Sequence, residues 1–250
     1  MIRNSHQIAN VIVMGNWGVG KSQFIEELSN MISQERGIRN IFFDSDRYYF
    51  EDAVRKDTAG KAPEPDGSII GLHSVLVEDG PRGRMIFRAL DGTIFNEAHR
   101  EMLYGLSQCT PGVIRTVEYA TGPNNSFQQG EELDQSGRFV VKHLVEGKVI
   151  LQTFVIELEA PFAVRKKRNT TREDPVDAIA FELYGKPGGK ITNEDAALLG
   201  ENFLHVKNHS VPLERSARRV FQEYLQSRLL RDEREQTIEG DNLHRGTPER

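Results

Sequence analysis

The chain of 250 residues carries a formal net charge of −5 and has an isoelectric point near 5.9, which argues against a general nucleic-acid binder, because such proteins need a basic surface to displace counterions. Hydrophobic residues make up 38% of the chain and charged residues 28%, a balance that suits one α/β domain with a very polar surface. The single cysteine, Cys109, excludes an internal disulfide. The sequence shows no signal-peptide pattern and no apolar run long enough for a membrane span. We therefore expect a cytoplasmic protein without membrane partners.

The first predicted elements surround a phosphate-binding pattern. A strand over Ala9–Met14 leads into residues 15–22, whose sequence GNWGVGKS fits G-x-x-x-x-G-K-[ST]. A helix follows to about Ser33, because apolar residues recur at helical spacing through 24–32, and Gly37 is expected to end it as a left-handed cap. Strand, loop and helix together predict a nucleoside triphosphate site.

The chemistry of this loop depends on its residue types. Glycines let the backbone N–H groups turn toward phosphate oxygens, and the positive end of the following helix faces the same anion. Lys21 is expected to reach the β- and γ-phosphates and Ser22 to hold Mg²⁺. Trp17 either packs under the nucleotide or shields the loop. The predicted contacts to ATP come from Gly15, Asn16, Trp17, Gly18, Val19, Gly20, Lys21, Ser22 and Gln23.

The elements after the loop alternate between strands and helices. We expect a short buried strand over Ile41–Phe43, an exposed loop at 57–68, and a hairpin at 72–90 made of two strand-like runs around a Gly/Pro turn. Then follow a helix near 98–106, a strand over Val113–Ala120, a helix near 139–145, and a strand over Phe154–Leu158 that starts at 149 at the earliest.

The last third predicts a helix capped at Asp174, a shorter helix opened by Thr192, a strand over Phe203–Val206 and a closing helix near 213–229. This alternation predicts a P-loop NTPase fold, a three-layer α/β/α sandwich around a mostly parallel five-stranded sheet with the hairpin as an insertion. The domain would span residues 1–230, and residues 231–250 would form a disordered tail. Ligands bind such folds at the carboxyl ends of the strands.

Carboxylates follow two of these strands. Asp44 and Asp46 come after the second strand, where a carboxylate can accept a proton from an attacking hydroxyl, although both could also be solvated helix caps. Glu118 lies at the end of the strand over 113–120, where an acidic residue can position Mg²⁺ or a water, although it could also face solvent. We therefore predict Asp44 and Asp46 as catalytic residues and Glu118 as a metal ligand beside Ser22.

An arginine-rich segment, RKKRNTTR at 165–172, follows the strand at 154–158. Arg165, Arg168 and Arg172 are three and four residues apart, so they lie on one side of a helix. Guanidinium groups bind two phosphate oxygens at once, and we predict a catalytic lid over 162–175 that clamps the transferring phosphates. A solvated basic run is the alternative. The histidines at 73, 99, 143, 205 and 209 have no ligand-like spacing and are expected to be surface or hydrogen-bonded core residues.

Together these features resemble the phosphate-loop kinases of small molecules, the nucleoside and nucleotide kinases with their shikimate- and uridine-kinase relatives. Phe42–Asp46 is similar to the Asp-x-Asp of shikimate-type kinases, Phe154–Arg172 to the lid entry of nucleoside and thymidylate-type kinases, and Val206–Asn208 to the segment before their closing helix. The chain lacks the Asp-Arg-[Tyr/His/Ser] that many of them carry on strand 3, and the hairpin is not standard. The resemblance implies transfer of the γ-phosphoryl group of ATP to a small metabolite, of the nucleoside or nucleotide class by the likeness of the lid.

A second class of function stays open. A GTPase is disfavoured because no Asn-Lys-x-Asp motif is present, and a large oligomeric ATPase because no apolar run ends in adjacent Asp-Glu. A P-loop ATPase or an ATP-binding regulatory switch without a small-molecule acceptor remains the alternative to a kinase.

Overall fold

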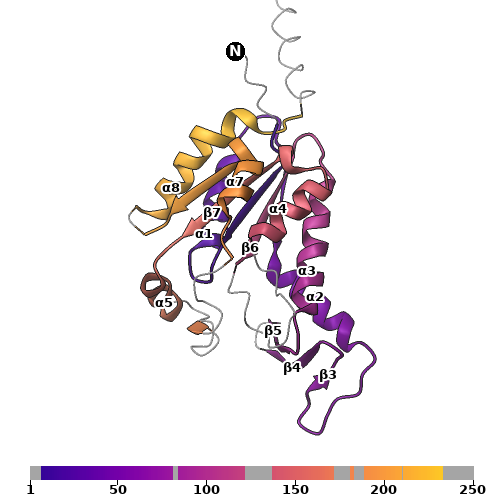
Figure 1. Ribbon diagram of the computed structural model, residues 1–250. Coiled ribbons are helices and arrows are strands. Elements are labelled where there is room, and N and C mark those ends of the chain that lie inside the picture. Colours follow the sequence, from indigo (N-terminus) through magenta and orange to yellow (C-terminus); the bar gives the residue numbers. More distant parts are fainter. Residues whose placement is uncertain are drawn as a thin grey trace, which may run out of the picture.

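Five parallel strands form the central sheet, in the order β2-β6-β1-β7-β8 (Figure 1). The computed structural model describes residues 7–80, 84–121, 137–171, 181–182, 189–209 and 211–232. The strands are β1 (Asn10–Gly15), β2 (Asn40–Ser45), β6 (Val113–Ala120), β7 (Thr153–Glu159) and β8 (Phe203–Lys207). Every residue of β1 is buried, because this strand lies at the centre of the sheet and both of its faces are covered.

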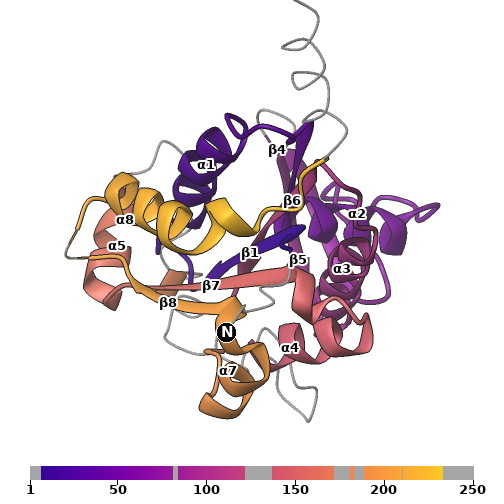
Figure 2. The same cartoon turned by 90° about the horizontal axis from the view of Figure 1, so that it is seen from above.

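Helices cover both faces of the sheet (Figure 2). One face carries α1 (Lys21–Ile32) and α8 (Leu213–Val220), which share one hydrophobic core with alternate residues of β1 and β7. The opposite face carries α3 (Thr93–Tyr104), α4 (Gly137–Glu146) and α7 (Asn193–Leu199) over a second core. The predicted three-layer α/β/α sandwich is confirmed. No described helix is both long and apolar enough to cross a membrane.

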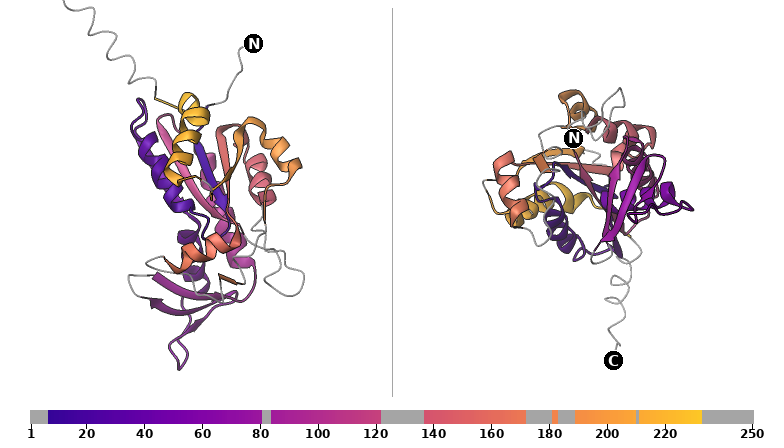
Figure 3. Two further views of the ribbon diagram at one scale, coloured as in Figure 1. Left: turned by 90° about the vertical axis from the view of Figure 1, so that its left-hand side faces the viewer. Right: turned by 90° about the horizontal axis from the view of Figure 1, so that it is seen from below.

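A small antiparallel sheet of β3 (Ile69–Ile70), β4 (Ser74–Gly80) and β5 (Arg84–Ala89) forms the insertion. Its β4–β5 pair is the predicted hairpin, with a bulge between Leu76 and Glu78. Leu76 and Phe87 pack against a third apolar cluster with α3 and with α2 (Asp46–Thr58). The small sheet and α5 (Phe162–Thr170) both lie at the end of the molecule where the phosphate loop is found (Figures 1 and 3).

Several predicted boundaries differ from the structure. The strand β2 is an edge strand and not a buried one, because β6 is its only neighbour among the described strands. Phe42 and Phe43 are 45% and 52% exposed. Helix α2 extends to Thr58, so the exposed loop begins only at 59. Helix α1 ends at Ile32, and Gly37, with φ +76°, belongs to the turns that follow it. Strand β7 does not begin at 149, because residues 150–152 form a 3₁₀ turn.

The closing helix also departs from a regular α-helix. After α8 the chain continues as a π-helical turn over Phe221–Leu225 and a 3₁₀ turn over Gln226–Arg228. Arg231 and Asp232, at the start of the predicted tail, still contact the domain through Glu35 and Arg39. The helix predicted from Asp174 and the tail from residue 233 lie outside the described residues.

His99 in α3 is a buried histidine without the hydrogen bonds that we expected of a core histidine. Its ring is fully buried against those of Phe50, Tyr119 and Phe139. Neither ring nitrogen has a hydrogen-bond partner among the described residues. Burial lowers the pKa of His99 to about 3, since a charged imidazolium would lose its solvation there.

This buried imidazole predicts an acid-sensitive fold. The pKa of His99 is lower in the folded state than the ordinary 6.5, so the neutral ring favours folding fully above pH about 6.5, and that contribution is lost as the pH falls toward 3. We expect His99→Leu to reduce the slope of unfolding free energy against pH by about 1.4 kcal/mol per pH unit in this window. Urea unfolding at several pH values measures it. Exposed His209→Gln serves as the control, and an unchanged slope in His99→Leu would contradict the prediction.

Candidate functional site

The phosphate loop connects β1 to α1, as the sequence predicts, and the surrounding elements fit closely around it. Gly15 has φ +151°, and a Cβ there would lie 2.5 Å from the Leu158 carbonyl oxygen. Gly20 has φ +97°, and a Cβ there would lie 2.9 Å from the side-chain nitrogen of Asn208. Glycine is therefore required at both positions by backbone conformation and by close approach.

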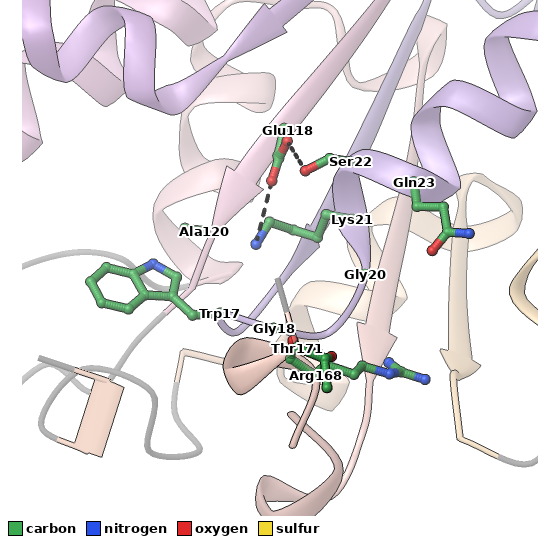
Figure 4. A pocket seen from close by; sticks show the side chains of 10 residues that line it. All are labelled: Trp17, Gly18, Gly20, Lys21, Ser22, Gln23, Glu118, Ala120, Arg168 and Thr171. Atoms are coloured by element: carbon green, nitrogen blue, oxygen red, sulfur yellow. Dashed lines mark hydrogen bonds and ion pairs between the residues drawn. The ribbon is translucent and has the colours of Figure 1, made fainter. Parts of the chain in front are cut away.

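A cavity of about 470 Å³ opens over this loop (Figure 4). It is lined by Trp17, Gly18, Gly20, Lys21, Ser22, Gln23, Glu118, Ala120, Arg168 and Thr171. Of the predicted loop contacts, Gly15, Asn16 and Val19 are not among the lining residues. Val19 packs into the core and the Asn16 side chain donates to the Thr121 carbonyl, so these residues shape the loop from behind.

Lys21, Ser22 and Glu118 converge at the mouth of the loop (Figure 4). The Ser22 hydroxyl donates to Glu118 Oε2 over 2.9 Å, and Lys21 Nζ lies 3.8 Å from Glu118 Oε1. Lys21 Nζ also donates to the Gly15 carbonyl oxygen over 3.1 Å. Glu118 reaches the loop because β6 pairs with β1 in parallel register, which places the two carboxyl ends side by side.

This pair of oxygen donors suits Mg²⁺. The ion takes one or two protein oxygens and completes its octahedron with water and substrate phosphates. The Ser22 hydroxyl and the Glu118 carboxylate, already 2.9 Å apart, fit that requirement. No cluster of three or more His, Cys, Asp or Glu side chains is placed to hold a metal anywhere in the described part of the chain. The residues therefore fit a metal that arrives with a nucleotide.

The arginines of α5 hold the loop itself. Arg165 is 1% exposed and donates from Nε to the Ala160 carbonyl and from Nη1 to the Trp17 carbonyl, each over 3.1 Å. Burial lowers its pKa. The predicted clamp on transferring phosphates does not fit this geometry for Arg165, because its guanidinium faces backbone carbonyls in the interior. It is a positioning residue for the loop.

Arg168, one turn further along α5, lines the cavity. Its Nη1 donates to the Val19 carbonyl and its Nη2 to the Asn208 carbonyl, each over 3.0 Å. In Figure 4 it lies on the side of the loop nearer Gln23 and away from Glu118. Arg168 thus contacts both the phosphate loop and the residue after β8, and it faces the cavity. Arg172 lies outside the described residues.

The two predicted catalytic aspartates are placed differently. Asp44 Oδ2 lies 3.3 Å from Arg115 Nη1, and the Tyr49 hydroxyl donates to Asp44 Oδ1 over 3.4 Å. Asp44 pairs with Val117 across the sheet and Ser45 with Glu118, so Asp44 and Glu118 project from opposite faces. Burial and the Asp44 carboxylate raise the pKa of Tyr49 to about 12. Asp44 is absent from the cavity lining. Asp46 is the first residue of α2, and its side chain lies outside the described part of the chain.

Two further buried polar residues, one of which contacts the phosphate loop, were not among the predicted ones. Asn208 is fully buried and its Nδ2 donates to the Val19 carbonyl over 2.6 Å. The Glu157 carboxylate, 4% exposed, accepts from the Ile191 N–H and lies 2.9 Å from His205 Nδ1. The position of Asn208 after a predicted strand was a usable signal, while the Glu157–His205 pair joins residues 48 positions apart, which no local pattern reveals.

Comparison with known proteins matches the amino-terminal part of the chain, which contains the phosphate loop, to one family. The family model "KAP family P-loop domain" matches residues 1–117, just under half of the chain. None of the curated proteins matches the chain. The geometry of the loop and the order of the parallel sheet give the chain a P-loop NTPase-like fold with a nucleotide-binding loop.

Solved structures of similar shape include three kinases at low identity. A sugar kinase from Janibacter sp. HTCC2649 is 16% identical, with a TM-score of 0.45 over 88% of this chain and 95% of its own. The shikimate kinase of Acinetobacter baumannii, solved with shikimate, is 12% identical, with a TM-score of 0.43 over 89% and 96%. That of Bacteroides thetaiotaomicron is 12% identical, with a TM-score of 0.41 over 86% and 97%. Likeness at this level gives no information on the activity of the chain.

Proposed function

We propose that the protein is an ATP-dependent phosphotransferase that moves the γ-phosphoryl group to a small metabolite, with a nucleoside or nucleotide as the expected acceptor class. The observation that carries the proposal is the convergence of Lys21, Ser22 and Glu118 over a 470 Å³ cavity. The small β3–β5 sheet lies at the same end of the molecule as the phosphate loop (Figure 3). This position supports the proposal that an acceptor binds beside the nucleotide.

The proposed reaction assigns one task to each group. The loop N–H groups bind the β-phosphate and Lys21 the β- and γ-phosphates. Ser22 and Glu118 would hold Mg²⁺, which would supply positive charge to the phosphate oxygens. Asp46 takes the proton from the acceptor hydroxyl, and the oxygen of that hydroxyl bonds to the γ-phosphorus. The bond from that phosphorus to the β–γ bridging oxygen breaks, and ADP leaves. Arg168 neutralises charge that develops on the phosphates.

Asp46 and Asp44 together give the test of the acid–base assignment. We expect Asp46→Asn to cut acceptor-dependent turnover by about 10²-fold or more and to leave ATP affinity nearly unchanged. Asp44→Asn is the matched control: it weakens the contact with Arg115, so we expect a lower melting temperature and a small change in turnover. The opposite pattern, with Asp44→Asn inactive and stable, would contradict the assignment.

The alternative is a P-loop ATPase or an ATP-binding switch, which the match to the KAP family P-loop domain favours. A coupled assay of ADP release, with Mg·ATP and a panel of nucleosides, nucleotides, sugars and shikimate-like acids, separates the two. A kinase releases ADP faster when its acceptor is added. Slow hydrolysis that no metabolite accelerates would favour the alternative and overturn our proposal.

A further inference from the structure

Trp17 occupies a distinct place in the cavity. It is the only tryptophan of the chain and stands third in the phosphate loop. Its main chain is fixed, because the buried Arg165 donates to the Trp17 carbonyl over 3.1 Å. The indole is half-buried and lines the cavity on the side where Ala120 ends β6 (Figure 4). The loop therefore carries a large aromatic face at a defined position.

The two ends of the cavity differ in chemistry. In Figure 4 the indole of Trp17 lies on one side of the Lys21 ammonium group, while Gln23 and Arg168 lie on the other side. Lys21 and the Ser22–Glu118 pair mark the position of the γ-phosphate and its metal. The rest of a nucleotide must extend from there along α1, toward Gln23 and Arg168, because the loop N–H groups and the helix start bind the inner phosphates. That direction leads away from Trp17.

We infer that Trp17 is a wall of the acceptor site, and that its indole face contacts a cyclic acceptor held beyond the γ-phosphate. The inference rests on the proposed phosphotransferase activity. An indole face attracts flat π systems and ring faces that carry polarised C–H groups, so the acceptor is a ring compound such as a nucleoside or a cyclic polyol. The bound ring also excludes water from the γ-phosphate, which favours transfer over hydrolysis. Trp17 is thus a specificity-determining residue and not a support for the nucleotide base.

The single tryptophan makes the contact directly measurable. Acrylamide quenching of Trp17 emission is followed in the free protein, with Mg·ADP, with Mg and a non-hydrolysable ATP analogue, and with that analogue plus each metabolite that stimulates ADP release. We expect Trp17 to stay quenchable with either nucleotide and to become protected when the acceptor is added. Nucleosides, cyclic polyols and linear polyols form separate arms, and only ring compounds should protect.

Two variants accompany the quenching experiment. We expect Trp17→Ala to raise the KM for the acceptor about tenfold, with an ATP dissociation constant within about twofold of wild type. Trp17→Phe keeps an aromatic face and should restore most of the acceptor affinity. Full protection of Trp17 by Mg·ADP alone would overturn the inference, as would stimulated turnover with unchanged quenching or protection by linear polyols. If no metabolite stimulates ADP release, the phosphotransferase proposal fails and the acceptor wall fails with it.

Discussion

Replacing Lys21 by alanine is expected to lower the rate of ATP turnover by about 10²- to 10³-fold, because each positioned donor to a developing phosphate charge contributes on the order of 3 kcal/mol to transition-state stabilisation. Lys21 is 6% exposed, and its ammonium group lies between the Gly15 carbonyl and Glu118 at the mouth of the loop. Among the described residues, no other lysine lines the cavity. The loss should therefore appear in turnover and in affinity for the triphosphate.

The measurement combines steady-state kinetics, calorimetric titration with ATP and thermal unfolding. The exposed Lys61→Ala variant serves as the control for loss of a positive charge, since Lys61 lies in the loop after α2. We expect Lys21→Ala to unfold within a few degrees of wild type, because one hydrogen bond to a carbonyl contributes little to stability. Wild-type turnover in Lys21→Ala would show that the loop assignment is wrong.

Replacing Arg165 by alanine is expected to destabilise the protein by about 3 kcal/mol, because two charge-assisted hydrogen bonds to buried carbonyls are lost and the stem leaves a void. The Ala160 and Trp17 carbonyls lose their guanidinium donor, and the phosphate loop loses one of the side chains that fix its backbone. ATP affinity should fall as well, since a loosened loop must be ordered again on binding.

Urea unfolding and ATP titration test this expectation, with Lys167→Ala as the matched control. Lys167 is exposed and belongs to the same helix and the same basic run, so it reports the loss of charge alone. If Arg165→Ala unfolds like Lys167→Ala but has lost turnover, the lid role predicted from the sequence holds and the positioning role does not.

The central fold could be predicted from the sequence because its signals are local. The phosphate loop, β1 and β6 are each marked by glycine spacing or an apolar run, and Glu118 is adjacent to the loop because both strands end at the same edge. The edge position of β2 could not be predicted, because Ile41–Phe43 reads like a buried strand and only the strand order leaves Phe42 exposed.

The contacts of the arginines and aspartates could not be predicted from the sequence for a related reason. The spacing of Arg165 and Arg168 predicts a shared helix face, but only the packing of α5 turns that face onto the loop carbonyls. Asp44 finds Arg115 on the neighbouring strand, 71 positions away, and so becomes part of an ion pair. Residue type and spacing predict which chemistry is available, while partners distant in sequence decide how it is used.

The carbonyls of the phosphate loop are held from outside by groups that come late in the chain. Arg165 binds the Trp17 carbonyl, and Arg168 and Asn208 both bind that of Val19. During synthesis from the amino terminus the loop leaves the ribosome before these groups, and Asn208 follows Val19 by 189 positions. The N–H groups of the loop are therefore fixed for anion binding only after nearly the whole domain has been synthesised. A chain that is still being translated carries the phosphate-binding sequence without a finished phosphate site.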